Sequence, residues 1–328
     1  MTIAWVLGSN GLLGKALCRA LLSNGSELFS PAERFSWDND IELTTQITTA
    51  VQAFSAKVDE TDQWEIYWAA GVGTMGSVAA SFTPETQALS LLLQRLQSDP
   101  HLMATSGSFA FASSAGAIYA GSTDDIITEN TVPAPTTDYA REKLLQENLV
   151  STFALANSRT TALMARISTL YGSGQAAGKK QGLLTHIARS ILRNQPIQIY
   201  VPYDTIRDYI TADDAASAMI ATLRSKNQKS QVTIKIIASE YPATIAEIVS
   251  IFKRIARRKP LIVTSASKLS SLYSRRVQFR SRVLIEHPKT SATKLSVGIA
   301  QLMVAEREAF VRSASTIELS RAQHLKNN

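Results

Sequence analysis

The chain has 328 residues, of which 45% are hydrophobic and 19% are charged. This composition is that of a folded globular protein and excludes a disordered or fibrous chain, and the single cysteine, Cys18, excludes an intrachain disulfide framework. The net charge of +7 comes from one segment, because ten Lys or Arg and no acidic residue lie between residues 252 and 282. Anions of a substrate, a solvated face or nucleic acid would each explain such a segment.

The sequence does not suggest a membrane protein. Met1 and Thr2 lead directly into an apolar stretch with no basic segment before it, so no signal peptide is expected. The longest uncharged stretch, residues 100–123, is rich in Ser, Gly and Thr and is too polar to cross a bilayer. We therefore expect a cytoplasmic protein that makes no membrane contact.

Short apolar stretches alternate with helical patterns along the first half of the chain. Strands are predicted at residues 3–7, 27–30, 66–69, 109–113 and 162–167. Helices are predicted at residues 12–24, 41–56, 84–96 and 139–153. This alternation is typical of an α/β protein whose doubly wound parallel sheet is covered by helices on both faces.

The pattern is less regular after Gly172. Helices are predicted at residues 182–193, 213–224, 245–257 and 295–325, the last with a polar end. Strands are predicted at residues 198–201 and 232–237. The second half therefore forms a smaller α/β unit followed by a C-terminal helix.

A glycine-rich turn, Gly8-Ser-Asn-Gly11-Leu-Leu-Gly14, joins the first predicted strand to the first helix. The first glycine permits a tight turn, the second lets the backbone approach a pyrophosphate, and the third allows close packing of helix on strand. The helix N-terminus then faces the phosphates. Its GxxGxxG spacing differs from the GxGxxG of many dehydrogenases, but its place between strand and helix predicts dinucleotide binding rather than a plain loop.

Tyr139 and Lys143 lie four residues apart and so project from one face of a predicted helix. A phenol titrates near pH ~10, and a nearby ammonium together with a positive nicotinamide ring favours its ionised form. Such a tyrosine can move a hydroxyl proton while hydride leaves the same carbon. Ser113 and Ser114 end a predicted strand upstream, where a hydroxyl can hold the substrate oxygen. The alternative interpretation of Tyr139 and Lys143 is a solvent-exposed pair on a helix. The alternative for Ser113 and Ser114 is an ordinary turn.

Six motifs in order over about residues 1–220 together resemble the extended short-chain dehydrogenase/reductases, the NAD-dependent epimerase/dehydratase family. They are Gly8-Ser-Asn-Gly11-Leu-Leu-Gly14, Trp68-Ala-Ala-Gly71, Ser113-Ser-Ala-Gly-Ala-Ile-Tyr119, Tyr139-Ala-Arg-Glu-Lys143, Arg166-Ile-Ser-Thr-Leu-Tyr-Gly172 and Arg207-Asp-Tyr-Ile-Thr-Ala-Asp-Asp214.

The resemblance implies a Rossmann-type domain for NAD or NADP over residues 1–172, to which a strand and a helix return from about 198–238. Residues 173–328 would mainly form a substrate-binding domain and the C-terminal helix. The implied substrate is a nucleotide sugar, and the implied assembly is a homodimer. The four histidines and one cysteine are scattered, so no metal site is expected. Residues 252–282 contain no known nucleic-acid motif, so nucleic acid is not the expected partner.

The resemblance also assigns residues to roles. Tyr139 is the implied acid/base, Lys143 contacts the nicotinamide ribose, and Ser114 holds the substrate oxygen. The implied cofactor-binding residues are Gly8, Asn10, Gly11, Leu12, Leu13, Gly14, Arg34, Asp38, Ala69, Ala70, Gly71, Tyr139, Lys143 and Ile167. The implied substrate-binding residues are Ser114, Thr169, Arg207, Arg280 and Arg282, with the Arg207 fork suited to a diphosphate.

The serine position departs from the family pattern. Counting back from Tyr139 selects Ser114, whereas alignment on Ile118 and Tyr119 places Ala115 at the hydroxyl position. We favour Ser114, because a loop absorbs one residue more easily than the chemistry loses its hydroxyl. The Asp-Glu pair that 4,6-dehydratases carry after this position is absent, so dehydratase chemistry is not expected. Thr169 replaces an Asn that commonly precedes the later Tyr-Gly.

Cofactor choice depends on the end of the second strand, where NAD-preferring Rossmann enzymes place a carboxylate on the adenine ribose. That position falls near Ala32, flanked by Glu33, which could move into the role, and Arg34, which could pair with a 2′-phosphate. We therefore favour NADP(H) and a 4-keto-sugar reductase, with an NAD-dependent 4-epimerase as the alternative. A non-catalytic NAD(P)-binding regulator, or a nucleic-acid binder using residues 252–282, is the alternative outside enzymes.

Overall fold

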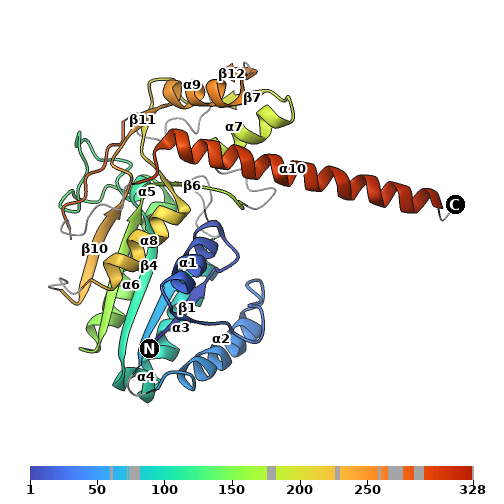
Figure 1. Ribbon diagram of the computed structural model, residues 1–328. Helices are drawn as coiled ribbons and strands as arrows, with labels where there is room; N and C mark the ends of the chain where they lie inside the picture. Colours follow the sequence, from blue (N-terminus) through green and yellow to red (C-terminus); the bar gives the residue numbers. More distant parts are fainter. Residues whose placement is uncertain are drawn as a thin grey trace.

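The computed structural model describes residues 1–59, 62–71, 73, 82–175, 182–225, 230–257, 260–264, 276–283 and 292–326, with side chains to residue 312. A layered α/β body forms the lower part of Figure 1, and a smaller part built from later residues lies above it. The C-terminal helix α10 (Leu295–Lys326) begins against the upper part and projects away from it (Figure 1).

A sheet of six described strands forms the centre of the lower part. In spatial order they are β10 (Val232–Ile237), β5 (Thr160–Ile167), β4 (Ser106–Ser114), β3 (Gln63–Trp68), β1 (Thr2–Leu7) and β2 (Glu27–Phe29). Every neighbouring pair is parallel. The strands read as nearly continuous apolar stretches because helices cover both faces of the sheet.

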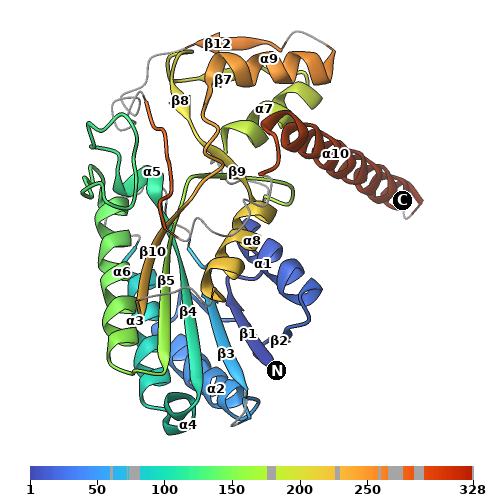
Figure 2. The ribbon, with the colours of Figure 1, turned by 60° about the vertical axis from the view of Figure 1, so that its left-hand side comes forward.

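Two groups of helices bury these faces, as Figure 2 shows from a second side. One face packs against α1 (Leu12–Ser23) and α8 (Ala212–Leu223). The other packs against α2 (Asp40–Ser55), α3 (Thr83–Gln97) and α6 (Asp138–Leu155), with the short α4 (Pro100–Ala104) beside them. The core on this second side holds Trp5, Trp64 and Trp68, each exposed by 1% or less. Truncating one such side chain to Ala typically costs about 3–5 kcal/mol of stability.

The strand order reverses direction at β1, whose neighbours are β2 on one side and β3 on the other. In doubly wound sheets, ligands bind in the crevice outside the carboxyl ends of the strands at such a switch point. Here Gly8 follows β1 and Ala69 follows β3. The fold therefore places two of the sequence motifs at the position where a ligand is expected.

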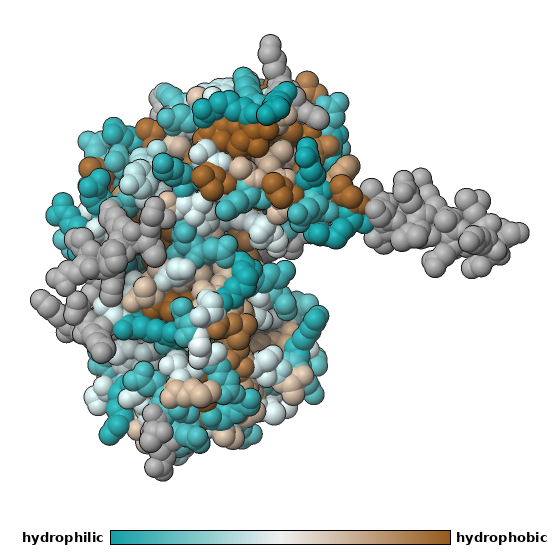
Figure 3. Space-filling model, in the orientation of Figure 1, coloured by the Kyte–Doolittle hydropathy of each residue, from teal (hydrophilic) through white to brown (hydrophobic). Residues whose placement is uncertain are grey.

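Among the described residues, the upper part contains three short strand pairs and two helices that precede α10. The pairs are β6 (Thr169–Tyr171) with β9 (Tyr209–Thr211), β7 (Ile197–Ile199) with β12 (Ile262–Thr264), and β8 (Ile206–Arg207) with β11 (Ala243–Thr244). The helices are α7 (Leu183–Leu192) and α9 (Ile245–Ala256), which share a core with the start of α10. Figure 3 shows apolar side chains reaching the surface in this region. Arg189 of α7 fixes α10 through Glu306, with Nε 2.8 Å from Oε2.

The predicted α/β class and doubly wound sheet are confirmed. Within the stretch 198–238, α8 and β10 return to the central layers, whereas β7 pairs with β12 in the upper part. Much of the basic segment, namely residues 258–259 and 265–275, lies outside the described residues. In the part of the chain that the structure describes, no helix is long and apolar enough to cross a membrane.

Candidate functional site

The glycine turn after β1 leaves no room for side chains. Gly8 has φ +84°, and a Cβ placed on it would lie 2.6 Å from the carbonyl carbon of Ala69. A Cβ on Gly14 would lie 2.0 Å from the carbonyl oxygen of Gly8. The amide of Gly11 closes the turn by donating to that same oxygen at 2.9 Å. The first and third glycines therefore let α1 start directly against the ends of β1 and β3.

The same turn presents backbone donors. The first amides of a helix have no intrahelical acceptor, and the N-cap residue of α1, Gly11, has no side chain to bond them. The first turn of α1 also contains no acidic residue. The amides of Leu12, Leu13 and Gly14, together with the positive end of the helix dipole, thus fit an anion such as a pyrophosphate.

The segment after β2 lies beside this turn in the fold. β2 ends at Phe29, and the next residue is the exposed Ser30, so no carboxylate follows the strand directly. Arg34 and Asp38 are both exposed. Trp37 joins this segment to the end of β3, because its ring lies edge-on to Trp68 with centroids 6.3 Å apart.

Helix α6 places Tyr139 and Lys143 on one face, as their spacing predicts. Thr137 caps the helix by accepting from the amide of Ala140 at 3.2 Å. Tyr139 is half-buried in the first turn, whereas Lys143 is 6% exposed, with its Nζ 5.9 Å from the centre of the Tyr139 ring. The ammonium also lies 4.9 Å from the ring of Phe111 on β4. The lysine therefore occupies a low-dielectric position directly behind the tyrosine.

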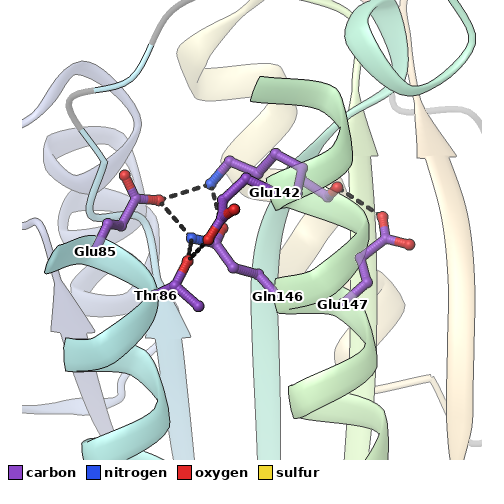
Figure 4. Close-up of polar contacts among 7 residues, drawn as sticks. Glu85, Thr86, Glu142, Gln146 and Glu147 are labelled. Carbon is purple, nitrogen blue, oxygen red and sulfur yellow. Dashed lines mark hydrogen bonds and ion pairs between the residues drawn. The ribbon is translucent and has the colours of Figure 1, made fainter. Parts of the chain in front are cut away.

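Lys143 has two buried polar partners that the sequence did not reveal. Its Nζ donates to Glu85 Oε1 at 2.9 Å and to Gln146 Oε1 at 3.0 Å. Figure 4 shows Glu85 and Thr86 on α3 facing Glu142 and Gln146 on α6. Gln146 Nε2 donates to Thr86 Oγ1 at 2.8 Å, which ties the two helices together. Removing one partner of a buried ion pair typically costs about 3–5 kcal/mol, because the other charge is left uncompensated.

The two serines at the end of β4 have different surroundings. Ser113 is 6% exposed and donates from Oγ to Glu147 Oε1 at 2.6 Å. Ser114 is half-buried, lies opposite Ile167 of β5, and is the N-cap of the short helix α5 (Ala115–Ile118). Ala115 is fully buried in a small apolar cluster. Of the three candidate positions, Ser114 is thus the one whose side chain remains accessible.

A second buried ion pair lies beneath these serines. Arg166 donates to Glu147 from Nε to Oε1 at 3.0 Å and to Oε2 at 3.3 Å, and from Nη2 to Oε2 at 2.7 Å. It also donates from Nη1 to the hydroxyl of Tyr119. Burial alone would lower the pKa of Arg166, but the contact with Glu147 outweighs it, so the pKa is raised. Burial raises the pKa of the Tyr119 hydroxyl. This network holds the end of β4 against α6 and β5.

Thr169 and Arg207 lie on neighbouring short elements of the upper part. Thr169 donates from its amide to the carbonyl of Asp208 at 3.1 Å, and Arg207 is half-buried with Nη1 2.9 Å from the carbonyl oxygen of Ile206. The side chain of Asp208 accepts from Ser168 at 2.6 Å and from the amide of Ser239 at 2.9 Å. Burial raises the pKa of Asp208, although these hydrogen bonds oppose the shift. Asp208 thereby fixes the positions of Thr169 and Arg207 relative to the ends of β5 and β10.

The segment 276–283 carries the other two predicted substrate contacts, Arg280 and Arg282. It starts beside Ile206, where Arg276 forms a bridge, and then runs past Ile127. Its backbone is fixed by Glu129, which accepts from the amide of Arg282 at 2.9 Å. Both Arg280 and Arg282 are exposed.

Comparisons with known proteins agree with this arrangement. Solved structures with similar folds include UDP-glucose 4-epimerase of Thermus thermophilus in complex with NAD, with a TM-score of 0.77 and 18% identity, covering 94% of this chain and 99% of that one. Another is RMD of Pseudomonas aeruginosa complexed with NADPH, with a TM-score of 0.75 and 19% identity, covering 94% of this chain and all of the other. At these identities the likeness shows the fold.

Two curated relatives share parts of the sequence. One is dTDP-L-rhamnose 4-epimerase of Burkholderia thailandensis, 31% identical over 96 residues, which are 29% of this chain and 26% of the relative. The other is dTDP-4-dehydro-6-deoxyglucose reductase of Escherichia coli, 31% identical over 113 residues, which are 34% of this chain and 35% of the relative. The matched stretch thus spans about a quarter to a third of each relative's length.

The family comparison covers far more of the chain. Residues 4–236 match the NAD dependent epimerase/dehydratase family, and this range includes the glycine turn, both serines, Tyr139, Lys143 and Arg207. The predicted resemblance is thereby confirmed: the chain belongs to the NAD dependent epimerase/dehydratase family.

Proposed function

We propose that this protein is an NADP(H)-dependent reductase of a nucleotide-linked 4-keto sugar. The observation that carries the proposal is the position of Tyr139 and Lys143 on α6 and of Ser114 at the end of β4, at the same edge of the sheet as the glycine turn. The open backbone donors of that turn fit the pyrophosphate of a dinucleotide. Tyr139 as an acid and a dinucleotide site at the same edge of the sheet would allow a proton and a hydride to be transferred to one carbonyl group.

Tyr139, Ser114 and Lys143 each have a defined part in the proposed reaction. The reduced nicotinamide supplies the hydride to C4 when the cofactor is bound. Tyr139 gives its hydroxyl proton to the C4 oxygen, and the hydroxyl of Ser114 holds that oxygen in place. Lys143 holds the nicotinamide ribose and places a positive charge behind the tyrosine. The carbonyl thus gains one hydride and one proton and becomes a hydroxyl.

The upper part would hold the sugar nucleotide. Arg207 is our proposed contact to the diphosphate, since a planar guanidinium matches phosphate oxygens with two parallel donors. Thr169, Arg280 and Arg282 are proposed to bind the rest of the substrate. A substrate bound there and a cofactor bound at the glycine turn would meet at Ser114 and Tyr139.

The choice of NADP(H) rests on the end of β2. The strand is followed by Ser30 without a carboxylate, and Arg34 is exposed nearby. A positive side chain there can pair with the 2′-phosphate, whereas NAD-dependent enzymes generally use a carboxylate on the 2′-hydroxyl. Several structures of similar fold hold NAD, and another holds NADPH.

A titration of the purified protein with NADH and NADPH tests this choice. We expect NADPH to bind more tightly, and Arg34→Ala to weaken NADPH about tenfold, the effect of losing a contact of ~1.4 kcal/mol, while NADH binding stays the same. Tighter binding of NADH, with NADPH affinity unchanged in the variant, would make the NAD-dependent 4-epimerase the better assignment. That alternative is favoured by the partial similarity to a dTDP-L-rhamnose 4-epimerase.

We further propose a homodimer, which follows from the resemblance to the family, and we propose the cytoplasm as its location. Light scattering coupled to size exclusion gives the mass in solution, with twice the 35.7 kDa of the chain expected.

A further inference from the structure

The buried ammonium of Lys143 is held from two sides before any ligand is present. Glu85 comes from the first turn of α3, and Gln146 comes from the next turn of the lysine's own helix. The side chains of Lys143 and Glu85 are each 7% exposed, so solvent contributes little to neutralising either charge. The acidic group on α3 is thus the counter-ion of the lysine on α6.

An ammonium group has three N–H donors in a tetrahedral arrangement. Glu85 Oε1 and Gln146 Oε1 take two of them, at 2.9 and 3.0 Å. The direction of the third is then fixed by the other two. A donor oriented in this way loses little rotational freedom when it bonds a ligand, which is the effect of preorganisation.

Glu85 also lies against the turn that follows β3. A Cβ placed on Gly71 would be 3.2 Å from each of the two carboxylate oxygens of Glu85. Gly71 belongs to the Trp68-Ala-Ala-Gly71 motif, and Ala69 of the same motif packs against Gly8 of the glycine turn. The carboxylate of Glu85 therefore lies against both Lys143 on α6 and Gly71, in the turn that follows β3 at the switch point.

We propose that Glu85 is a positioning residue for the cofactor, acting through Lys143: it neutralises the buried ammonium and aims its remaining donor at the nicotinamide ribose. This inference rests on the proposed function, because it requires Lys143 to contact the cofactor. It explains why an acid and an amide converge on a lysine that is otherwise surrounded by the rings of Phe111 and Tyr139.

A double-mutant cycle in cofactor binding tests the proposal. Glu85→Ala and Lys143→Ala are each expected to weaken NADPH about tenfold, and the double variant is expected to weaken it about tenfold as well, because the glutamate acts only through the lysine. Glu85→Gln keeps an oxygen acceptor for the lysine and should lose less affinity than Glu85→Ala. Glu142→Gln is the matched control: it removes a carboxylate one residue from Lys143 that bonds Thr86 instead, and NADPH affinity should not change.

The outcomes separate the inference from the proposed function. Losses that multiply to about a hundredfold in the double variant, or a Glu85→Ala variant that binds like wild type, would overturn the inference alone. If Glu85→Ala does not fold because Lys143 is left unpaired, the comparison of Lys143→Ala with the double variant remains: equal affinities support the proposal, and a weaker double variant contradicts it. A wild-type protein that binds neither NADH nor NADPH would overturn the proposed function and this inference with it.

A kinetic readout distinguishes positioning from general weakening of the fold. Glu85→Ala should lower kcat and raise the KM for NADPH, while the KM for the sugar nucleotide stays the same. An equal rise in both KM values would instead indicate a structural role for Glu85 and contradict the proposal.

Discussion

The proposed cofactor side and the proposed substrate side of this molecule are built in different ways. On the cofactor side, backbone atoms approach so closely that only glycine fits, as at Gly8 and Gly14, and the supporting strands are buried on both faces. On the proposed substrate side, the strands have only two or three residues, and single carboxylates hold the connecting segments: Asp208 accepts from the amide of Ser239, and Glu129 accepts from the amide of Arg282. The backbone can recognise a phosphate common to all dinucleotides, whereas side chains on short elements can vary with the sugar.

The largest effect is expected where the two sides meet. Tyr139→Phe removes one acidic proton and little volume, so we expect turnover to fall at least about a thousandfold, within the range for lost acid–base catalysis. The cofactor dissociation constant should be nearly unchanged. Turnover and NADPH titration of the same preparation measure both quantities. A variant with normal turnover would show that another group transfers the proton.

Gly14→Ala tests the backbone-built side. Its new methyl group would lie 2.0 Å from the carbonyl oxygen of Gly8, so the turn must open and the amides of α1 must shift. We expect cofactor binding to weaken by about a hundredfold or more, with a loss of about 1–3 kcal/mol of stability from overpacking. Calorimetric titration and thermal unfolding measure the two effects.

The control for this change is Gly116→Ala. A Cβ at Gly116 would meet no heavy atom within 4 Å, so its unfolding midpoint should match the wild type. Normal NADPH binding by Gly14→Ala would contradict a dinucleotide site at this turn.

The two serines provide a matched pair on the same strand. Ser114→Ala should lower kcat about a hundredfold, the usual size for a lost positioned donor, with little change in stability. Ser113→Ala removes the 2.6 Å bond to Glu147 and should cost about 1.5–3 kcal/mol of stability with a much smaller change in kcat. Rates and denaturant midpoints for both variants decide the assignment, and the reverse ranking would place the active hydroxyl at Ser113.

Arg207→Ala tests the substrate side and has the smallest expected effect. It should raise the KM for the sugar nucleotide about tenfold, as expected for a lost contact of ~1.4 kcal/mol, and leave the cofactor dissociation constant unchanged. Steady-state kinetics at saturating cofactor give the first value. An equal loss of both affinities would place Arg207 in the fold rather than at the substrate.

The sequence allowed the cofactor side to be predicted in detail and the substrate side only in outline. The glycine turn, the four-residue spacing of Tyr139 and Lys143, and the central strands follow from local patterns that are also local in the structure. The short strands β6, β8, β9 and β11 were not predicted, because two or three residues carry too little periodicity.

Glu85 was missed for a different reason. An acid in the first turn of a helix is common because it complements the helix dipole, so its sequence position indicates nothing further. Its partner Lys143 is 58 residues away, and only packing of α3 against α6 joins them. Similarly, the difference between Ser113 and Ser114 depends on which one meets Glu147 of α6, which no count along the chain reveals.

Isotope transfer to the substrate tests the central claim most directly. Wild-type protein is incubated with nucleotide-linked 4-keto sugars and NADPH that carries deuterium at the transferable position, and product and cofactor are quantified together. We expect one deuterium at C4 of the sugar for each NADPH consumed, and no transfer by Tyr139→Phe. Interconversion of 4-hydroxy epimers without net NADPH consumption, or no transfer to any such sugar, would contradict it.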